Sequence, residues 1–362
     1  DILIKRLEVS YGISEVVLDW FLSYVTNRSQ SVRIGRRVSN SSTLRYGVPQ
    51  GSVLGPVLFT LYSKPLSNII ENQNCNYHKY ADDTELSSSV AVGNFDVAVG
   101  DVQSCIEHVM MWMNSNKLKL NPDKTEVMAV GSIYSPLGSI GMSSIDIGDS
   151  SVDFQNSCIY LDINLDNRLT LDKRISSICS ACYYDIRRIA CIRKFLTQKA
   201  ASKLMSALVI SRLDYCNSLL VSASQAQIDR LQKVQNHAAR VVMKKRMSDH
   251  VTPLLHELHW LPIKYRCQFK VATFAFRHFD KSLPSYLSNY LKSREYGRDV
   301  RSNDIKRLDP PRKPNLKTVG GRTFSRIAPG IWNSLPSGLK EIDELPIFKR
   351  ELKTHLFRKH FG

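Results

Sequence analysis

The sequence has no long hydrophobic run, no dense cysteine framework and no repeat of fixed period. No apolar stretch approaches the roughly 20 residues that a membrane-spanning helix needs, so we expect no membrane segment. The 8 cysteines are scattered through 362 residues, and the chain does not open like a signal peptide. These features argue against a secreted or disulfide-stapled protein. They favour an intracellular one, in the nucleus, the cytoplasm or both.

Two of the cysteines, Cys179 and Cys182, form a C-x-x-C inside a helical pattern. A zinc finger needs a second Cys/His pair at a set spacing, and no such pair follows. Packing in a helical core is therefore the favoured interpretation, and metal binding is the alternative.

Charge is plentiful but unevenly placed. The formal net charge is +17; residues 1–150 carry 12 Lys and Arg against 15 Asp and Glu, and residues 151–362 carry 38 against 18. A positive field of this size favours a polyanion such as nucleic acid, or an acidic membrane surface. The acidic front suits carboxylates that hold metal ions, and the basic rear suits a phosphate backbone. The alternative explanation for any single Lys or Arg is that it lies on the solvent-exposed face of a helix.

Apolar spacing predicts an α+β protein. The expected helices are two within 1–25, one after 57, and others near 101–116, 171–195, 198–213 and 225–245. The expected strands form hairpins at 31–45, 76–86 and 118–130, with a further strand at 157–165. The Gly/Ser-rich segment 131–151 predicts a flexible connection, residues 292–327 predict loops, and the last third predicts only a modest core.

One predicted hairpin has an acidic tip. Residues 76–81 favour a strand, Asp82 and Asp83 interrupt it, and residues 84–86 return. Nucleotidyl transfer in polymerases uses two divalent ions that carboxylate oxygens hold, so an Asp-Asp tip could supply part of that shell. An isolated Asp pair has a simpler explanation, because Asp is common in turns for its own hydrogen bonding.

The pair is not isolated. Together with a segment about 25 residues upstream, it resembles the palm of non-LTR (LINE-type) reverse transcriptases: Gly47-Val48-Pro49-Gln50-Gly51-Ser52-Val53-Leu54-Gly55-Pro56, then Tyr80-Ala81-Asp82-Asp83. Later stretches resemble further parts of this family. Leu118 to Glu126 resembles the next palm motif, and Tyr160-Leu161-Asp162 resembles the primer grip. The thumb and tail of jockey-like elements are resembled by Arg212 to Leu220, Leu258-His259-Trp260-Leu261-Pro262 and Trp332-Asn333-Ser334-Leu335-Pro336.

The resemblance implies an RNA-directed DNA polymerase that uses an RNA template, a DNA primer, dNTPs and Mg²⁺, or Mn²⁺ in its place. It implies a partial palm over 1–133, a connection with the primer-grip hairpin over 134–170, a helical thumb over 171–245 and a basic C-terminal region over 246–362. The residues it assigns are metal ligands Asp82 and Asp83, template or nucleotide contacts Pro49, Gln50, Gly51, Ser52 and Lys124, and primer-grip residues Tyr160, Leu161 and Asp162. For Pro49 and Gly51 the alternative is an ordinary strand-turn-helix junction, and for Lys124 a solvated turn lysine.

Two departures from that family matter. The chain opens on Asp1 in a helical pattern, so we expect an N-terminal truncation that removes the first palm motif and its carboxylate, and little activity from this chain alone. Asp162 stands where the family usually has glycine, which suggests decay of the element. The alternative functions are a non-catalytic RNA- or DNA-binding remnant, and a translated decayed element with no cellular role.

Overall fold

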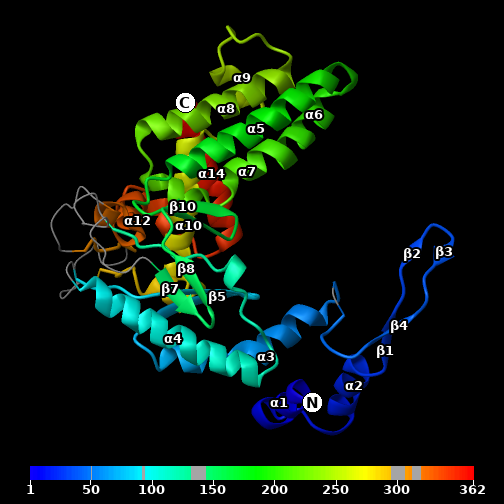
Figure 1. Cartoon of the computed structure of the whole chain (residues 1–362). Helices are drawn as coiled ribbons and strands as arrows, with labels where there is room; N and C mark the ends of the chain where they lie inside the picture. Colours follow the sequence, from blue (N-terminus) through cyan, green and yellow to red (C-terminus); the bar gives the residue numbers. More distant parts are fainter. Residues whose placement is uncertain (50, 92–93, 132–143, 295–305, 312–318) are drawn as a thin grey trace. The chain divides into compact units, whose positions relative to one another are not determined.

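The computed structural model describes residues 1–49, 51–91, 94–131, 144–294, 306–311 and 319–362. The chain divides into an N-terminal unit, Asp1–Val127 with Pro136–Gln155, and a C-terminal unit, Met128–Ser135 with Asn156–Gly362. In the described ranges every sheet is a two-stranded antiparallel hairpin set among helices (Figure 1), which agrees with the predicted α+β class. None of the described helices is long and apolar enough to cross a bilayer.

The described elements of the N-terminal unit alternate helices with hairpins. Its helices are α1 (Ile2–Tyr11), α2 (Glu15–Val25), α3 (Leu54–Glu71), α4 (Phe95–Ser115) and the short 3₁₀ turn η1 (Pro122–Lys124). Its strands are β1 (Arg28–Gln30), β2 (Arg33–Ile34), β3 (Arg37–Val38), β4 (Ser42–Leu44), β5 (Asn76–Tyr80), β6 (Asp83–Ser87), β7 (Ser144–Ile147) and β8 (Ser150–Asp153). The expected hairpin at 31–45 exists, with β2–β3 lying beyond β1–β4.

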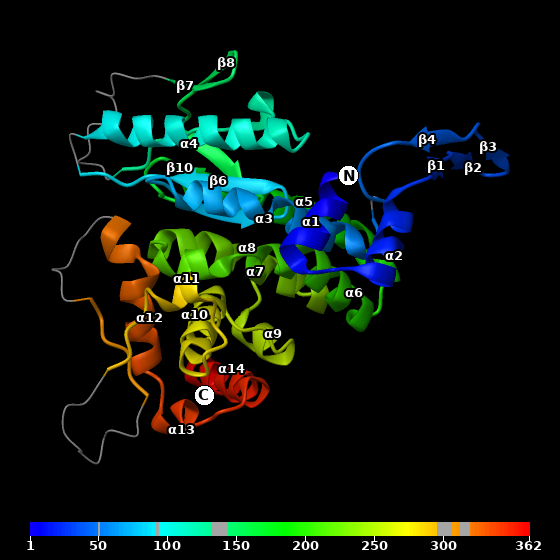
Figure 2. The same cartoon turned by 90° about the horizontal axis from the view of Figure 1, so that it is seen from below.

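Helices α3 and α4 build the small core of this unit. Their apolar stripes bury Leu66 and Ile70 from α3 and Cys105 and Val109 from α4, and the inner face of β5–β6 packs on the same cluster. Periodic apolar residues on a helix bury one face in this way. Figure 2 shows α3 and the β5–β6 hairpin on the same side of α4.

Two expectations about this unit are wrong. Residues 118–130 do not pair as strands, because Pro122 lacks an N–H and the Asn121 side chain accepts the N–H of Asp123, which together favour a tight 3₁₀ turn. The segment 131–151 is not simply a flexible connection: its described part contains the β7–β8 hairpin. The alternating Ile145 and Ile147 of β7 are buried with the second apolar face of α4. Residues 132–143 lie outside the described residues.

The described part of the C-terminal unit is one hairpin followed by helices. The hairpin is β9 (Ser157–Tyr160) with β10 (Ile163–Asp166). The helices are α5 (Asp172–Ile192), η3 (Arg193–Phe195), α6 (Gln198–Met205), the π-helix η4 (Ser206–Ile210), α7 (Ser211–Asp214), η5 (Asn217–Ser222), α8 (Gln225–Met243), α9 (Thr252–Glu257), α10 (Ile263–Phe279), α11 (Ser285–Ser288), η6 (Val319–Arg322), α12 (Phe324–Asn333), α13 (Ser337–Lys340) and α14 (Leu345–Phe361). The helices expected near 171–195, 198–213 and 225–245 are confirmed.

The last third has more core than its sequence predicts. Trp332 and Phe348 are fully buried there, and Phe276 stacks on Phe348 with ring centroids 4.4 Å apart. The expectation of a modest core is therefore wrong, since its apolar residues are spread over α10, α12 and α14 and meet only in three dimensions. Within 292–327, predicted as loops, α12 already begins at Phe324, and residues 295–305 and 312–318 lie outside the described residues.

Candidate active site

The two adjacent carboxylates lie at the tip of the β5–β6 hairpin. Tyr80 pairs with Asp83, so only Ala81 and Asp82 form the turn. Ala81 has φ 55° and Asp82 does not share this positive φ. A positive φ at the first turn residue alone is the pattern of a type II′ turn, which suits the right-handed twist of two strands and favours glycine at that position. A non-glycine residue held there costs about 1–3 kcal/mol, so the acidic tip is a strained turn.

The two faces of this hairpin differ. Tyr77 and Leu86 pack on the α3–α4 core, whereas Asp83 and Glu85 are exposed on the opposite face. Successive strand residues point to opposite sides. Asp82, in the turn itself, is exposed as well. The carboxylates of Asp82 and Asp83 are therefore exposed to solvent.

A lysine just before the acidic tip holds the hairpin to α3. Lys79 donates to the Ser63 carbonyl oxygen at 2.9 Å and lies 3.2 Å from Ser63 Oγ. Burial, with a smaller effect from Lys64, lowers the pKa of this ammonium. The sequence-based prediction missed Lys79. The sequence does contain a sign of this role, because the alternation of side chains along the strand places residues 77 and 79 on the same face.

The segment predicted to contact template or nucleotide leads into α3. Ser52 Oγ accepts the N–H of Gly55 at 3.1 Å, and the Ser52 N–H donates to the Pro49 carbonyl at 3.2 Å. Gly51 adopts φ 78°, a conformation that favours glycine. A Cβ on Gly55 would lie 3.1 Å from Ser52 Oγ. These contacts describe a tight junction before a helix, and Gln50 lies outside the described residues.

Lys124 ends the 3₁₀ turn η1 and is exposed. In the described part of the chain, no hydrogen bond or ion pair joins Lys124, Asp82 or Asp83 to another predicted site residue. No group of three or more His, Cys, Asp or Glu side chains among the described residues could hold a metal ion.

The predicted primer-grip residues form a second tight turn, which belongs to the C-terminal unit. Leu161 and Asp162 have φ 47° and 60° between the paired residues Tyr160 and Ile163. Positive φ at both positions is the pattern of a type I′ turn, which favours Asn, Asp or Gly. Asp162 therefore suits its backbone, and the change from glycine is no structural defect. Leu161 is the strained residue of the two.

Tyr215, from the motif at 212–220, holds this turn. Its hydroxyl donates to the Leu161 carbonyl at 2.7 Å. The Tyr215 carbonyl in turn accepts from the buried guanidinium of Arg174 at 2.7 Å. Sequence reasoning assigned no role to Tyr215, because nothing in the spacing connects residues 161 and 215.

Comparison with known proteins gives a consistent result. Residues 9–163 match the family model of the reverse transcriptase (RNA-dependent DNA polymerase) domain. That range includes the Asp82–Asp83 tip and ends within the β9–β10 hairpin. The chain thus contains a reverse transcriptase domain.

Two curated relatives come from Drosophila melanogaster. The probable RNA-directed DNA polymerase from transposon BS is 25% identical over 233 residues, which cover 61% of this chain and 25% of the relative. The probable RNA-directed DNA polymerase from transposon X-element is 24% identical over 300 residues, which cover 82% of this chain and 30% of the relative. The chain is thus similar to polymerases of transposons, and it spans less than a third of either relative.

Proposed function

We propose that the chain supplies the catalytic hairpin of an RNA-directed DNA polymerase that copies RNA into DNA. The observation that carries this proposal is the exposed pair Asp82, in the two-residue turn, and Asp83, directly after it, within the matched reverse transcriptase range. In the reaction, the primer 3′ oxygen bonds to the α-phosphorus of a dNTP. The bond to the leaving pyrophosphate breaks, and the 3′-hydroxyl proton is lost.

The residues at the tip suit a divalent ion, since Mg²⁺ prefers carboxylate oxygens and keeps several water and phosphate ligands. When bound, such ions activate the attacking oxygen and stabilise charge on the leaving group. Asp82 and Asp83 would supply oxygen ligands, and Lys79 would keep the hairpin seated on α3 while they do so. A third carboxylate would complete the set.

The remaining assignments stay proposals. Pro49, Gln50, Gly51 and Ser52 would lie along the template and incoming nucleotide, and Lys124 would approach the triphosphate. Tyr160, Leu161 and Asp162 would contact the primer. The tight turn before α3, the exposure of Lys124 and the Tyr215 clamp on Leu161 support these roles. An intracellular location also remains a prediction.

The test is Mg²⁺-dependent extension of a DNA primer on an RNA template. It compares residues 1–362 with a version that restores any coding sequence preceding codon 1 in the source element. Into the more active version we would place Asp82→Asn and Asp83→Asn, with Glu85→Gln as the matched control on the same exposed face of the hairpin. We expect each Asp variant to lose at least about a thousandfold in rate, roughly 4 kcal/mol of transition-state stabilisation, and the control to stay within threefold. Full activity of both Asp variants would refute the proposal.

A second candidate function is nucleic-acid binding without catalysis. The excess of 38 basic over 18 acidic residues in 151–362 favours it. Such binding should weaken steeply as salt rises, because cations released from the phosphates drive it. An affinity that does not change between 50 and 200 mM salt, about the range over which phosphate contacts lose most of their effect, would count against this function.

A further inference from the structure

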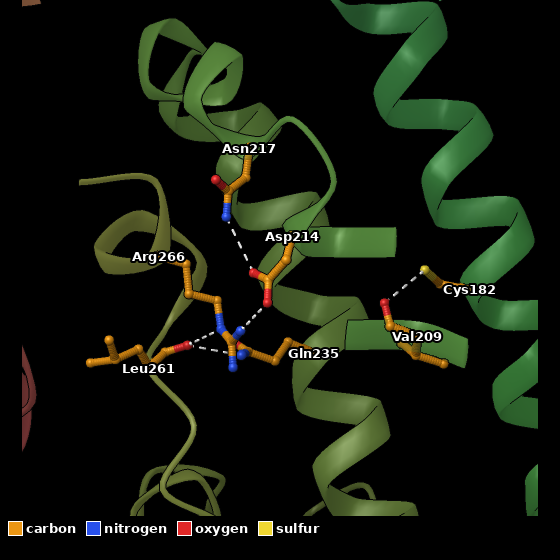
Figure 3. A network of polar contacts seen from close by, with 7 residues as sticks. All are labelled: Cys182, Val209, Asp214, Asn217, Gln235, Leu261 and Arg266. Atoms are coloured by element: carbon orange, nitrogen blue, oxygen red, sulfur yellow. Dashed lines mark hydrogen bonds and ion pairs between the residues drawn. The ribbon is translucent and has the colours of Figure 1, made fainter. Parts of the chain in front are cut away.

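Two motifs that the catalytic hairpin leaves unused meet in the C-terminal unit. Asp214 and Asn217 come from the motif at 212–220, and Leu261 comes from the motif at 258–262. Arg266 Nη1 donates to Asp214 Oδ2 at 2.6 Å, and Arg266 Nε donates to the Leu261 carbonyl at 2.7 Å (Figure 3). Gln235, fully buried, donates to the same carbonyl at 2.9 Å. This network fixes the two motif segments against each other.

The segments border a cavity of about 260 Å³. Its polar lining comes from η5, the loop before α10, and helices α7, α10 and α14: Asp214, Asn217, His259, Arg266, Lys270 and Lys353. Lys270 and Lys353 make no ion pair with any described residue. The cavity therefore presents unneutralised positive charge.

The one carboxylate in this lining, that of Asp214, already has partners within the protein. Asp214 Oδ2 is paired with Arg266, and Asp214 Oδ1 accepts from Asn217 Nδ2 at 3.2 Å. With that negative charge balanced, two lysine ammoniums remain to attract an anion. Lysine side chains are among the usual donors to the phosphate oxygens of nucleic-acid backbones.

Asn217 adds a second requirement. The residue is 5% exposed, and its Oδ1 has no hydrogen-bond donor among the described residues. Figure 3 shows the amide nitrogen directed to Asp214 and the oxygen turned away from it. A buried acceptor without a donor costs about 1–3 kcal/mol, so a ligand that offers a donor would gain from this site. The phosphates and sugars of DNA offer none, whereas the 2′-hydroxyl of RNA does.

We propose that this cavity binds one nucleotide of an RNA strand, with a phosphate between Lys270 and Lys353 and the ribose 2′-hydroxyl donating to Asn217 Oδ1. The proposal rests on the nucleic-acid binding proposed above and gives it a location and a preference for RNA. It also gives the motif segments 212–220 and 258–262 a joint role.

The first experiment measures binding of the full chain to a fluorescent single-stranded RNA by anisotropy over a series of salt concentrations. It compares Lys270→Gln/Lys353→Gln with Lys264→Gln/Arg358→Gln. The control removes the same charge from exposed positions on the same two helices that do not line the cavity. We expect the cavity variant to bind RNA at least tenfold more weakly and the control to bind within threefold of wild type. The salt slope of the cavity variant should fall by about 0.7, the value for one single-strand phosphate.

The second experiment needs no variant, so misfolding cannot confuse it. The wild-type chain is titrated with RNA, with 2′-O-methyl RNA and with DNA of one sequence; the methylated strand keeps the phosphates but cannot donate. We expect RNA to bind at least fivefold more tightly than the other two. Equal affinity for all three strands would overturn the role of Asn217, and equal effects of the cavity and control variants would overturn the cavity. If the wild type binds no nucleic acid, the proposed binding function falls along with this inference.

Discussion

The two units of the chain place their chemistry differently. In the N-terminal unit, Asp82 lies in a strained two-residue turn, Asp83 is the first residue of β6, and both are exposed. In the C-terminal unit, polar side chains such as Arg174, Asp166 and Gln235 are buried and bonded to backbone. Substitutions in the first should therefore change activity more than stability, and substitutions in the second should do the reverse.

The largest expected stability effect is in the C-terminal unit. Phe348 is fully buried and stacks on Phe276, so Phe348→Ala should cost about 3–5 kcal/mol through lost contacts and a cavity. The matched control is Phe195→Ala, because Phe195 is 77% exposed, and it should change stability by no more than about 0.5 kcal/mol. Both are measured by urea unfolding followed by circular dichroism.

The same variant tests whether the units are independent. If they are, differential scanning calorimetry of Phe348→Ala should lower one transition and leave another unchanged. A single transition that shifts as a whole would break the comparison, because it would mean that the two units unfold together.

The sequence predicted the parts whose information is local. The stripe Ile175, Cys182 and Ile186 predicts a helix, and α5 buries all three. Cys182 lies in that core, as the favoured interpretation of the C-x-x-C predicted, and burial raises the pKa of its thiol to about 12. The acidic hairpin was likewise predicted, because a hairpin turn is set by adjacent residues, but its turn lies one residue earlier than expected: Ala81 and Asp82 form it, and Asp83 begins β6.

What the sequence could not predict depends on contacts between distant segments. The segment 131–151 was predicted as a flexible connection, but its Ile145 and Ile147 pack against the second apolar face of α4. The Tyr215 clamp on Leu161 and the Asn217 cavity depend on the packing of helices, and no spacing rule reports that. The family resemblance located the candidate catalytic residues but not their supports, of which Lys79 is the clearest example.

A smaller effect is expected at Asp166, which lies just before α5. Its carboxylate accepts from the backbone N–H groups of Arg168, Thr170 and Leu171 and from the Thr170 hydroxyl. Burial would raise the pKa of this carboxyl, but these hydrogen bonds outweigh it, and the pKa lies below its usual 3.8. Because the folded-state pKa is depressed, the stabilisation is complete above the unfolded-state value and is lost as pH falls through the folded-state value.

Asp166→Asn should therefore cost about 1–2 kcal/mol at pH 7, and the difference from wild type should shrink as the pH falls below 3.8. Urea unfolding at pH 7, 5, 4 and about 3, which spans the usual Asp range, measures this. Asp343→Asn is the control: its side chain is 87% exposed and, among the described residues, forms an ion pair with Lys306, and such exposed pairs contribute little. A difference for Asp166→Asn that stays constant with pH would show that the charge is not what stabilises the turn.

The smallest expected effect is at Ala81, in the turn of the β5–β6 hairpin. At φ 55° an alanine is strained, and glycine would relieve about 1–3 kcal/mol of strain while losing about 0.4–1 kcal/mol through the freer unfolded chain. The middle of the resulting net range is about 1.3 kcal/mol, so Ala81→Gly should slow hydrogen exchange of the β5–β6 amides by about tenfold, whereas the β-branched Ala81→Val should speed it. The side chain of residue 81 is exposed, so loss of packing would not explain the difference. If alanine, glycine and valine exchange alike, the turn does not hold a positive φ in solution, and the strain attributed to the acidic tip is absent.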